Sequence, residues 1–254
     1  MDDVYLQLLV DLHKPNLRQG PGGEVETIKA MALAGLDRSR PLKIADLGCG
    51  TGCASFLLAR ELDAEITAVD FLPAFLEILQ ARAQEQGVAE KIIPLNCSMD
   101  TLPFSDEDFD VIWSEGAIYN MGFEAGISAW RRFLKPGGKL VVSEITWLTA
   151  ERPDALQAHW DAEYPEIDVA SAKMALLEQH GYCPEAYFYL PKQCWLENYY
   201  QPIHNGIDAF LERNAQSEAA REIVESEKAE LALYEKYSDY FGYGVYIASK
   251  IRSG

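Results

Sequence analysis

The sequence predicts an α/β protein built on a doubly wound, mostly parallel seven-stranded sheet, with helical additions over the active face. Short β-rich runs alternate with apolar runs at helical spacing through residues 40–145, a rhythm typical of parallel βαβ units. A glycine-rich turn follows the first β-rich run. The 254 residues are 48% hydrophobic and 24% charged, which is enough apolar material for a full core.

The expected strands are apolar or β-branched runs bounded by turn residues, over 41–47, 65–70, 92–96, 109–114, 139–145, 186–190 and 243–249. The expected helices have apolar residues at helical spacing, over 4–14, 24–34, 54–62, 73–87, 125–134 and 171–180. Lys135-Pro136-Gly137-Gly138 predicts a turn before the fifth strand.

We expect one domain, residues 1–254, with three kinds of segment. Residues 1–38 form an N-terminal helical cap, and residues 40–145 form the ligand-binding core. Residues 148–168 and 192–240 are helical additions that leave the sheet after its fifth and sixth strands. Because ligands bind at the carboxyl ends of strands in open α/β sheets, these additions are expected to form a lid and a substrate pocket.

The composition disfavours several classes of partner. The formal net charge is -18, from 40 acids and 22 bases, which repels nucleic acid and anionic lipid. The N-terminus has acids where a secretory signal needs bases, and no apolar run could span a bilayer. We therefore expect a cytoplasmic protein that binds neither nucleic acid nor membrane; the sequence is compatible with a homodimer.

The five cysteines predict reduced thiols, because an odd number in a chain of this size argues against a disulfide framework. Cys49 and Cys53 are close in sequence, but no histidine or second CxxC pair accompanies them. We expect no metal site.

The central motif is Asp46-Leu47-Gly48-Cys49-Gly50-Thr51-Gly52, between an expected strand and an expected helix. Glycines at such a turn let the backbone approach a ligand closely. A dinucleotide fingerprint, GxGxxG, would need glycine at Cys53, and a phosphate-binding Walker loop would need a Lys-Ser or Lys-Thr pair. Neither is present.

Asp70 ends the next expected strand, where such folds place an acid on ribose hydroxyls. That acid is common to several nucleotide-binding classes. Phe71 follows directly, and its ring can either pack on an adenine or fill the core between helix and sheet.

These residues and three later motifs together resemble the class I S-adenosylmethionine-dependent methyltransferases, in the branch similar to ubiquinone and menaquinone C-methyltransferases and small-molecule methyltransferases. The ordered matches are Ile44 to Gly52, Ile66 to Phe71, Ser98 to Phe104, Phe109 to Ile112 and Leu134 to Gly138. Five ordered matches over about residues 40 to 145 are more specific than a lone glycine loop. The resemblance implies a Rossmann-like fold and S-adenosyl-L-methionine as cofactor.

The resemblance also implies roles for residues that match the motifs of the family. Asp46, Gly48, Cys49 and Gly50 would hold the methionine part, and Ser114 would face its amino group. Asp70 would bind the ribose, with Phe71 near the adenine. Where the family commonly has an acid, this chain has Ser98, so Ser98, the Met99 backbone or Asp100 would meet the adenine amino group.

Relatives of this branch close an N-terminal segment over the cofactor, which assigns the loop with Gln19 and Gly20 to that role; a plain linker is the alternative. Methyl transfer from a sulfonium to a small molecule is a direct displacement. An oxygen or nitrogen acceptor also needs a base, and the candidates are Glu115, Tyr119, Glu144 and His13, each of which could instead be structural.

Aromatic residues in the additions could wall an acceptor pocket or simply pack the added helices, and packing is favoured for most of them: Trp147, Trp160, Tyr164, Trp195, Tyr199 and Tyr200. Two other functions remain open: a protein that binds the cofactor without transferring methyl, and a nicotinamide-dependent oxidoreductase, which Cys53 disfavours.

Overall fold

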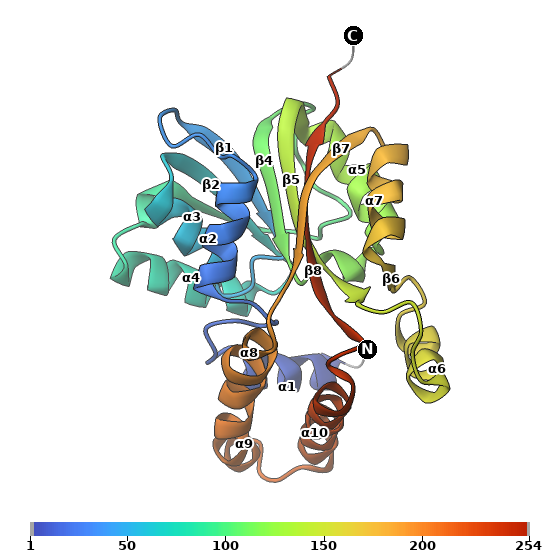
Figure 1. The fold of residues 1–254 in the computed structure, drawn as a ribbon. Coiled ribbons are helices and arrows are strands. Elements are labelled where there is room, and N and C mark those ends of the chain that lie inside the picture. The colour runs from blue at the N-terminus through green and yellow to red at the C-terminus, as the bar shows by residue number, and fades with distance from the viewer. Residues whose placement is uncertain (1–2, 253–254) are drawn as a thin grey trace.

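The computed structural model describes residues 3–252; residues 1–2 and 253–254 of the expected domain lie outside the described residues. One sheet runs through the molecule in the order β3-β2-β1-β4-β5-β8-β7, and β6 pairs with the end of β5 (Figure 1). The strands are β1 (Leu42–Leu47), β2 (Ala64–Asp70), β3 (Ile92–Asn96), β4 (Phe109–Glu115), β5 (Leu134–Trp147), β6 (Asp168–Val169), β7 (Tyr182–Tyr189) and β8 (Phe241–Lys250).

The helices lie where helical spacing predicts them, with ends shifted by a few residues. They are α1 (Asp3–His13), α2 (Glu24–Leu33), α3 (Cys53–Glu61), α4 (Pro73–Glu85), α5 (Phe123–Trp130), α6 (Asp154–Glu163), α7 (Ala170–Gln179), α8 (Lys192–Trp195), α9 (Gln201–Arg213) and α10 (Glu218–Tyr237).

The strand directions confirm a mostly parallel sheet. β1 runs parallel to β2 and β4, and β4 runs parallel to β5. β8 is antiparallel to both of its neighbours, β5 and β7. From β1 the chain builds the sheet outward through β2 to β3, and it then returns to place β4 on the other side of β1. The switch point therefore lies between β1 and β4, and sheets of this kind bind ligands at the carboxyl ends of the two strands that flank it.

The predicted turn at Lys135–Gly138 lies inside β5 and does not precede it. Leu134 pairs with Phe109, and regular pairing resumes at Lys139 after an irregularity. Gly137 has a φ of +78° there, a conformation that glycine adopts at little cost. The turn residues therefore form a bulge. The two-residue strand β6 was not predicted, because so short a run has no readable alternation.

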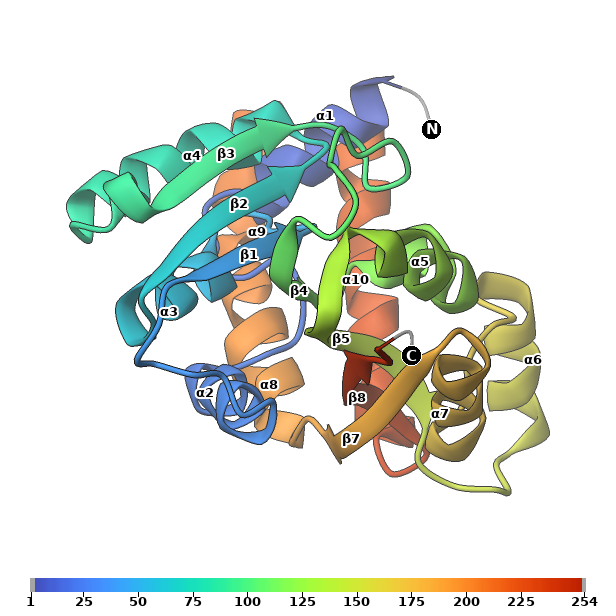
Figure 2. The same ribbon diagram turned by 90° about the horizontal axis from the view of Figure 1, so that it is seen from above.

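Helices cover both faces of the sheet (Figure 2). α2, α3 and α4 pack on one face, where their apolar residues join Ile44, Ile66 and Val111 in the larger core. On the other face, α5 and α7 bury Ile127, Trp130 and Leu177 against the strands.

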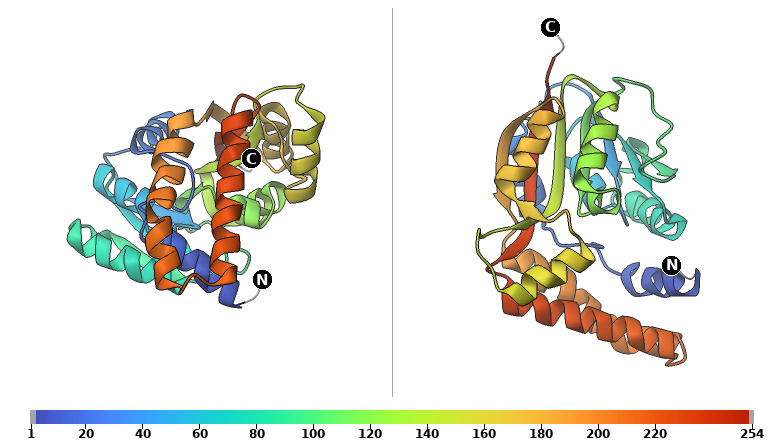
Figure 3. Two further views of the ribbon diagram at one scale, coloured as in Figure 1. Left: turned by 90° about the horizontal axis from the view of Figure 1, so that it is seen from below. Right: turned by 90° about the vertical axis from the view of Figure 1, so that its right-hand side faces the viewer.

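A further layer of helices lies beyond the carboxyl ends of β1, β2 and β4 (Figures 1 and 3). α1, α9 and α10 share a small core of their own, which includes Leu8, Phe210 and Ile223. The N-terminal segment is therefore divided: α1 joins this layer, whereas α2 packs on the sheet. Within residues 3–252, no helix is both long and apolar enough to cross a bilayer.

Candidate functional site

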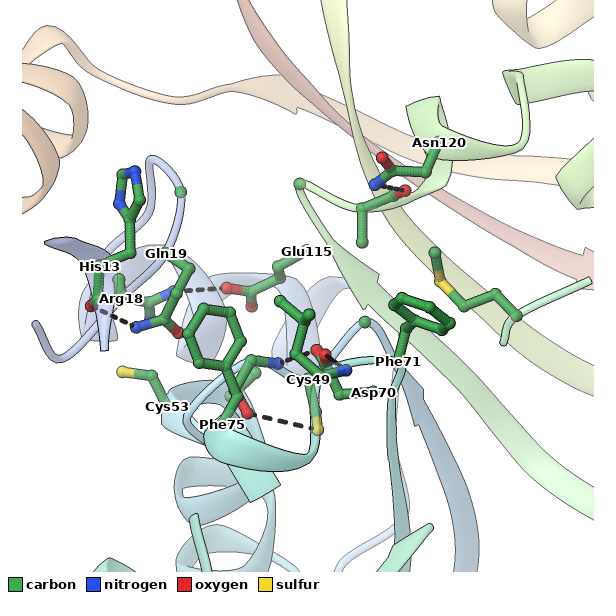
Figure 4. A pocket seen from close by; sticks show the side chains of 18 of the residues that line it. His13, Arg18, Gln19, Cys49, Cys53, Asp70, Phe71, Phe75, Glu115 and Asn120 are labelled. Carbon is green, nitrogen blue, oxygen red and sulfur yellow. Dashed lines mark hydrogen bonds and ion pairs between the residues drawn. The ribbon is translucent and has the colours of Figure 1, made fainter. Parts of the chain in front are cut away.

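A cavity of about 510 Å³ lies between the carboxyl ends of the parallel strands and the helical layer (Figure 4). Its floor is the loop after β1, with the ends of β2 and β4, and α1 and the loop after it form its roof. The predicted residues that line it are Gln19, Gly20, Asp46, Gly48, Cys49, Gly50, Asp70, Phe71, Ser98, Met99, Glu115 and Tyr119. The fold thus brings together residues that are up to 100 positions apart in the sequence.

The glycine loop needs its glycines for backbone conformation and for close packing. Gly48, Gly50 and Gly52 have φ values of +74°, +54° and +95°, in the region that side chains disfavour. A Cβ on Gly48 would collide with the Cβ of Ala117, in the loop after β4. The crowding at Gly48 therefore comes from a neighbouring loop, which holds the floor of the cavity in place.

Two buried carboxylates stand at the floor. Asp46 accepts a hydrogen bond from the Ser55 hydroxyl at 2.6 Å, and burial raises the pKa of Asp46 to about 7. Asp70 accepts from the backbone N–H of Gly50 at 2.8 Å and of Leu72 at 2.9 Å. Burial also raises the pKa of Asp70, although these two bonds oppose the shift. Asp70 therefore fastens the glycine loop to β2 and keeps lone pairs for a ligand.

Phe71 is 63% exposed at the cavity, so its ring does not fill the core between helix and sheet. Ser98 and Met99 line the same end of the cavity, whereas Asp100 is not among the lining residues. The Met99 carbonyl already accepts a hydrogen bond from Trp130 Nε1 at 3.1 Å. Of the three candidates for an adenine contact, Ser98 and Met99 line the cavity.

The loop between α1 and α2 is tied down over the glycine loop. Gln19 Oε1 accepts from the Thr51 backbone N–H at 2.8 Å, and Arg82 donates to Thr51 Oγ1 at 2.7 Å and to the Asn16 carbonyl at 3.0 Å. These contacts join the N-terminal segment to the glycine loop and to α4, so the segment is bound to the floor of the cavity.

Glu115, at the end of β4, is fully engaged. Its Oε2 accepts from Arg18 Nη1 at 2.6 Å, and its Oε1 accepts from Thr27 Oγ1 at 2.8 Å and from Trp113 Nε1 at 3.0 Å. Burial by itself would lower the pKa of Arg18, but the Glu115 carboxylate outweighs it and the pKa is raised. The pair is thus a charged tether between β4 and the N-terminal loop.

Aromatic residues from separate elements also line the cavity. Tyr119, in the short turn η2 (Ile118–Asn120), and Tyr199, in the π-helical turn η4 (Leu196–Tyr200), both line the cavity. His13 stacks on Tyr199, with 6.2 Å between ring centroids, and its Nε2 lies 3.3 Å from Glu227 Oε1. Burial raises the pKa of Tyr119 and of Tyr199, which keeps both hydroxyls protonated and disfavours Tyr119 as a base.

Two predicted site residues do not line the cavity. Ser114 is completely buried, and its hydroxyl donates to the Leu47 carbonyl at 2.8 Å, joining β4 to β1. Glu144 points to the other face of the sheet, where it is 1% exposed and lies 3.4 Å from Lys173 Nζ. Burial raises the pKa of Glu144 to about 7. In β4 and β5, successive side chains point to opposite faces of the sheet. This alternation explains why Ser114 and Glu144 do not face the cavity.

Most aromatic residues of the additions pack the core. Trp195 stacks on Tyr234 at 4.4 Å between centroids, and both are buried with Tyr200 and Trp147. Trp147 and Tyr200 do not reach the cavity described above. Substituting either is therefore no test of an acceptor pocket; among the six aromatic candidates, Tyr199 is the one on the cavity wall.

Sequence reasoning missed several lining residues. Leu6, Leu9 and Val10 of α1 have the helical spacing of ordinary core residues, and only the tertiary structure shows that they face a cavity. Arg18 lies in the segment expected to cover the site, but no sequence signal pairs it with Glu115. All five cysteines are free thiols, and Cys49 and Cys53 line the cavity.

Comparison with known proteins places residues 44–138 in a family described as a methyltransferase domain. An uncharacterised protein of Haemophilus influenzae is 31% identical over 147 residues, 57% of each chain. The methyltransferase GfsG of Streptomyces halstedii is 27% identical over 56% of this chain and 55% of its own. A demethylmenaquinone methyltransferase of Lactiplantibacillus plantarum is 34% identical over 41% of this chain and 45% of its own. The chain spans about half the length of these relatives.

Solved structures share the fold over nearly the whole chain. A methyltransferase from Geobacter sulfurreducens in complex with S-adenosyl-L-homocysteine has a TM-score of 0.83 at 21% identity, over 95% of this chain and 97% of that one. YjhP from E. coli has a TM-score of 0.84 at 20% identity, over 97% of this chain and 100% of that one. The [4+2]-cyclase SpnF has a TM-score of 0.77 at 20% identity, over 98% and 96%.

Proposed function

Because this chain belongs to the class I S-adenosylmethionine-dependent methyltransferases, we propose that it binds S-adenosylmethionine and transfers its methyl group to a small molecule by direct displacement. The observation that carries the proposal is the cavity itself. It brings the glycine loop, Asp70 and Phe71 to the carboxyl ends of neighbouring strands, in the order in which the family motifs occur along the chain.

The residues present fit the cofactor. Asp46 offers a carboxylate to the methionine ammonium group, next to the backbone of the glycine loop. Asp70 has lone pairs for the ribose hydroxyls, and the exposed ring of Phe71 can stack on the adenine, beside Ser98 and the Met99 N–H. The bound sulfonium would supply an electrophilic methyl group.

The protein would contribute positioning and exclusion of water, which can supply much of the barrier reduction in a displacement. The loop held by Arg18 and Gln19 covers the cofactor end of the cavity. Tyr119 and Tyr199 would bound the acceptor end. Since Glu115 is tied to Arg18, we assign it a positioning role and not that of a base.

Calorimetry with S-adenosylmethionine, S-adenosylhomocysteine and NAD tests the ligand, and transfer of a labelled methyl group into a metabolite extract tests the reaction. We expect both adenosyl ligands to bind and NAD not to bind. Label should appear in a low-molecular-weight product and be lost with Asp70→Ala. Binding of NAD alone would overturn the proposal in favour of an oxidoreductase.

The second candidate is a protein that binds the cofactor without transferring methyl. One observation favours it: a protein named as a cyclase shares this fold over 98% of the chain, and fold alone does not fix the reaction. Tight binding of S-adenosylhomocysteine, with no label transferred to any metabolite fraction, would establish this alternative.

A further inference from the structure

Helix α1 has apolar residues on two faces, and neighbouring helices bury one of these faces. Leu8 and Leu12, one turn apart, are buried in the small core that α1 shares with α9 and α10. Leu6 and Val10, also one turn apart, lie about 200° round the helix from them and are half-buried. Helices with apolar residues on opposite faces are typical of buried positions, so the second face also requires an apolar neighbour.

The second face of α1 is turned to the cavity. α1 lies between the carboxyl ends of the strands and the helices α9 and α10 (Figure 3). Leu6, Leu9, Val10 and His13 have the spacing of one helix face, and all four line the cavity. Among the described residues, Leu6 and Val10 belong to none of the three hydrophobic cores. The roof of the cavity therefore presents apolar surface that no protein core covers.

The charged side chains that line the cavity already have partners, apart from the two carboxylates of the floor. Arg18 pairs with Glu115 at 2.6 Å, and His13 Nε2 lies 3.3 Å from Glu227 Oε1. The proposed function assigns the two floor carboxylates to the cofactor. Within residues 3–252, no other charged side chain lines the cavity. A charged group on a second ligand would lose its water here without gaining a partner.

The lining also includes aromatic surface and uncharged polar groups. Tyr119 is 45% exposed, and it lines the cavity together with Asn120 and Tyr199. Phenol and amide groups form hydrogen bonds with uncharged hydroxyls and carbonyls. Apolar walls with a few polar groups are typical of sites for small organic molecules.

We infer that the methyl acceptor is an uncharged, apolar organic molecule, and that Leu6 and Val10 of α1 select it by covering its apolar surface. The inference rests on the proposed function, because it names the substrate class of the same cavity. Charged analogues are excluded by the cost of removing their charge from water. Each methylene that the roof covers adds about 0.8 kcal/mol to binding, which is a factor of about four in affinity.

The first test compares probes by calorimetry with the protein saturated in S-adenosylhomocysteine. One set differs in charge: 4-hydroxybenzyl alcohol, 4-hydroxybenzoate and 4-hydroxybenzylamine. We expect the alcohol to bind at least tenfold more tightly than either charged compound. A charged compound that binds as tightly as the alcohol would overturn the inference.

A second set of probes differs in apolar surface: 4-methylphenol, 4-ethylphenol and 4-propylphenol. Affinity should rise with each methylene, by up to about fourfold. Affinity that stays constant along this series, or no binding of 4-propylphenol at millimolar concentration, would contradict an apolar acceptor site.

Variants of the roof locate the effect. Val10→Thr and Leu6→Asn keep nearly the same side-chain shape but place a polar group on the cavity face of α1. Each should weaken 4-propylphenol binding about threefold to tenfold and leave the affinity for S-adenosylhomocysteine within about twofold. The matched controls are Val25→Thr and Leu33→Asn on α2, at positions that are 69% and 42% exposed and do not line the cavity. Circular dichroism checks that each variant is folded.

The two levels of proposal fail separately. If S-adenosylhomocysteine does not bind to the parent protein, the proposed function is wrong. If the roof variants weaken S-adenosylhomocysteine and leave 4-propylphenol unchanged, α1 covers the cofactor and only the further inference is wrong. The same holds if the roof variants bind 4-propylphenol as tightly as the α2 controls do.

Discussion

At the scale of single residues, the candidate site depends on carboxylates whose partners differ. Asp46, Asp70 and Glu115 all line the cavity, yet each has a different set of donors. Glu115 is neutralised by an arginine, Asp70 is held by two backbone N–H groups, and Asp46 has one hydroxyl. The charge that each presents to a ligand follows from these contacts.

Removing the Asp70 carboxylate should weaken cofactor binding. We expect Asp70→Ala to cost about 1.5 to 3 kcal/mol of binding free energy, since two hydroxyl partners lose a charged acceptor. Asp70→Asn, which keeps one oxygen, should cost less. Calorimetry with S-adenosylhomocysteine measures both, and unchanged affinity in Asp70→Ala would contradict the ribose assignment.

Cofactor affinity should depend on the ionisation of Asp46. Burial raises its pKa to about 7 in the free protein, and a cationic ammonium group beside it would favour the ionised form. Below pH 7, binding must then release a proton, so affinity should fall as the pH is lowered from 7 to 5.5, by at most about tenfold per unit.

Calorimetry in two buffers of different ionisation enthalpy would detect the released proton. Asp46→Asn should bind more weakly at pH 7 and show a flatter pH profile. An affinity that rises as the pH falls would show that Asp46 does not meet the ammonium group.

At the scale of elements, the segment between α1 and α2 has no helix or strand pattern in its sequence, and side-chain contacts set its position. Arg18, Gln19 and Asn16 tie it to β4, the glycine loop and α4. Glycines and a proline at 20–23 prevent a continuous helix, so the chain can cross the cavity between α1 and the sheet.

Breaking the Arg18–Glu115 pair should loosen this cover. Both side chains are largely removed from water, so Arg18→Ala leaves a poorly solvated charge, a change that destabilises by about 3 kcal/mol or more when a buried pair is broken. We expect faster dissociation of S-adenosylhomocysteine in stopped-flow measurements and quicker proteolysis within residues 14–23.

The matched control is Arg60→Ala, which removes an exposed pair with Glu24 and should change neither rate. Glu115→Gln, which keeps an acceptor for Thr27 and Trp113, should loosen the segment less than Arg18→Ala. Equal dissociation rates in all three variants would mean that the pair does not retain the ligand.

At the scale of the whole molecule, the fold raises the pKa of two carboxyl groups to about 7, one on each side of the sheet. Asp46 and Glu144 both have a pKa of about 7, in each case because of burial. Their values in an unfolded chain are near 3.8 and 4.5. At pH values between these unfolded-chain pKa values and 7, the folded protein binds more protons than the unfolded chain.

The free energy of unfolding without ligand should therefore fall as the pH rises from 5 to 7, because stability declines wherever the folded state holds more protons. The lowered pKa values of Asp11 and Asp110 act only in more acidic solution. Urea unfolding at pH 5, 6, 7 and 8 measures the trend. Asp46→Asn should flatten it and Glu222→Gln should not; a rise in stability over this interval would contradict the assignment.

The sequence by itself determined the alternation of strands and helices, the position of the glycine loop and the acid at the end of β2. These are local features: periodicity, turn chemistry and spacing within about thirty residues carry them. The same local reading singled out Asp46, Asp70 and Phe71, which all line the cavity, because the carboxyl ends of parallel strands lie at the same end of a sheet.

Only the tertiary structure decided which polar side chains face the cavity and which are already paired. Glu115 and Glu144 look alike in the sequence, yet one is tied to Arg18 at the cavity wall and the other is buried with Lys173 on the opposite face. His13 of α1 contacts Tyr199 and Glu227, and Glu227 lies 214 residues further along the chain. Local sequence carries no record of such pairings, because they arise when separate elements pack together and must satisfy each other's buried charges.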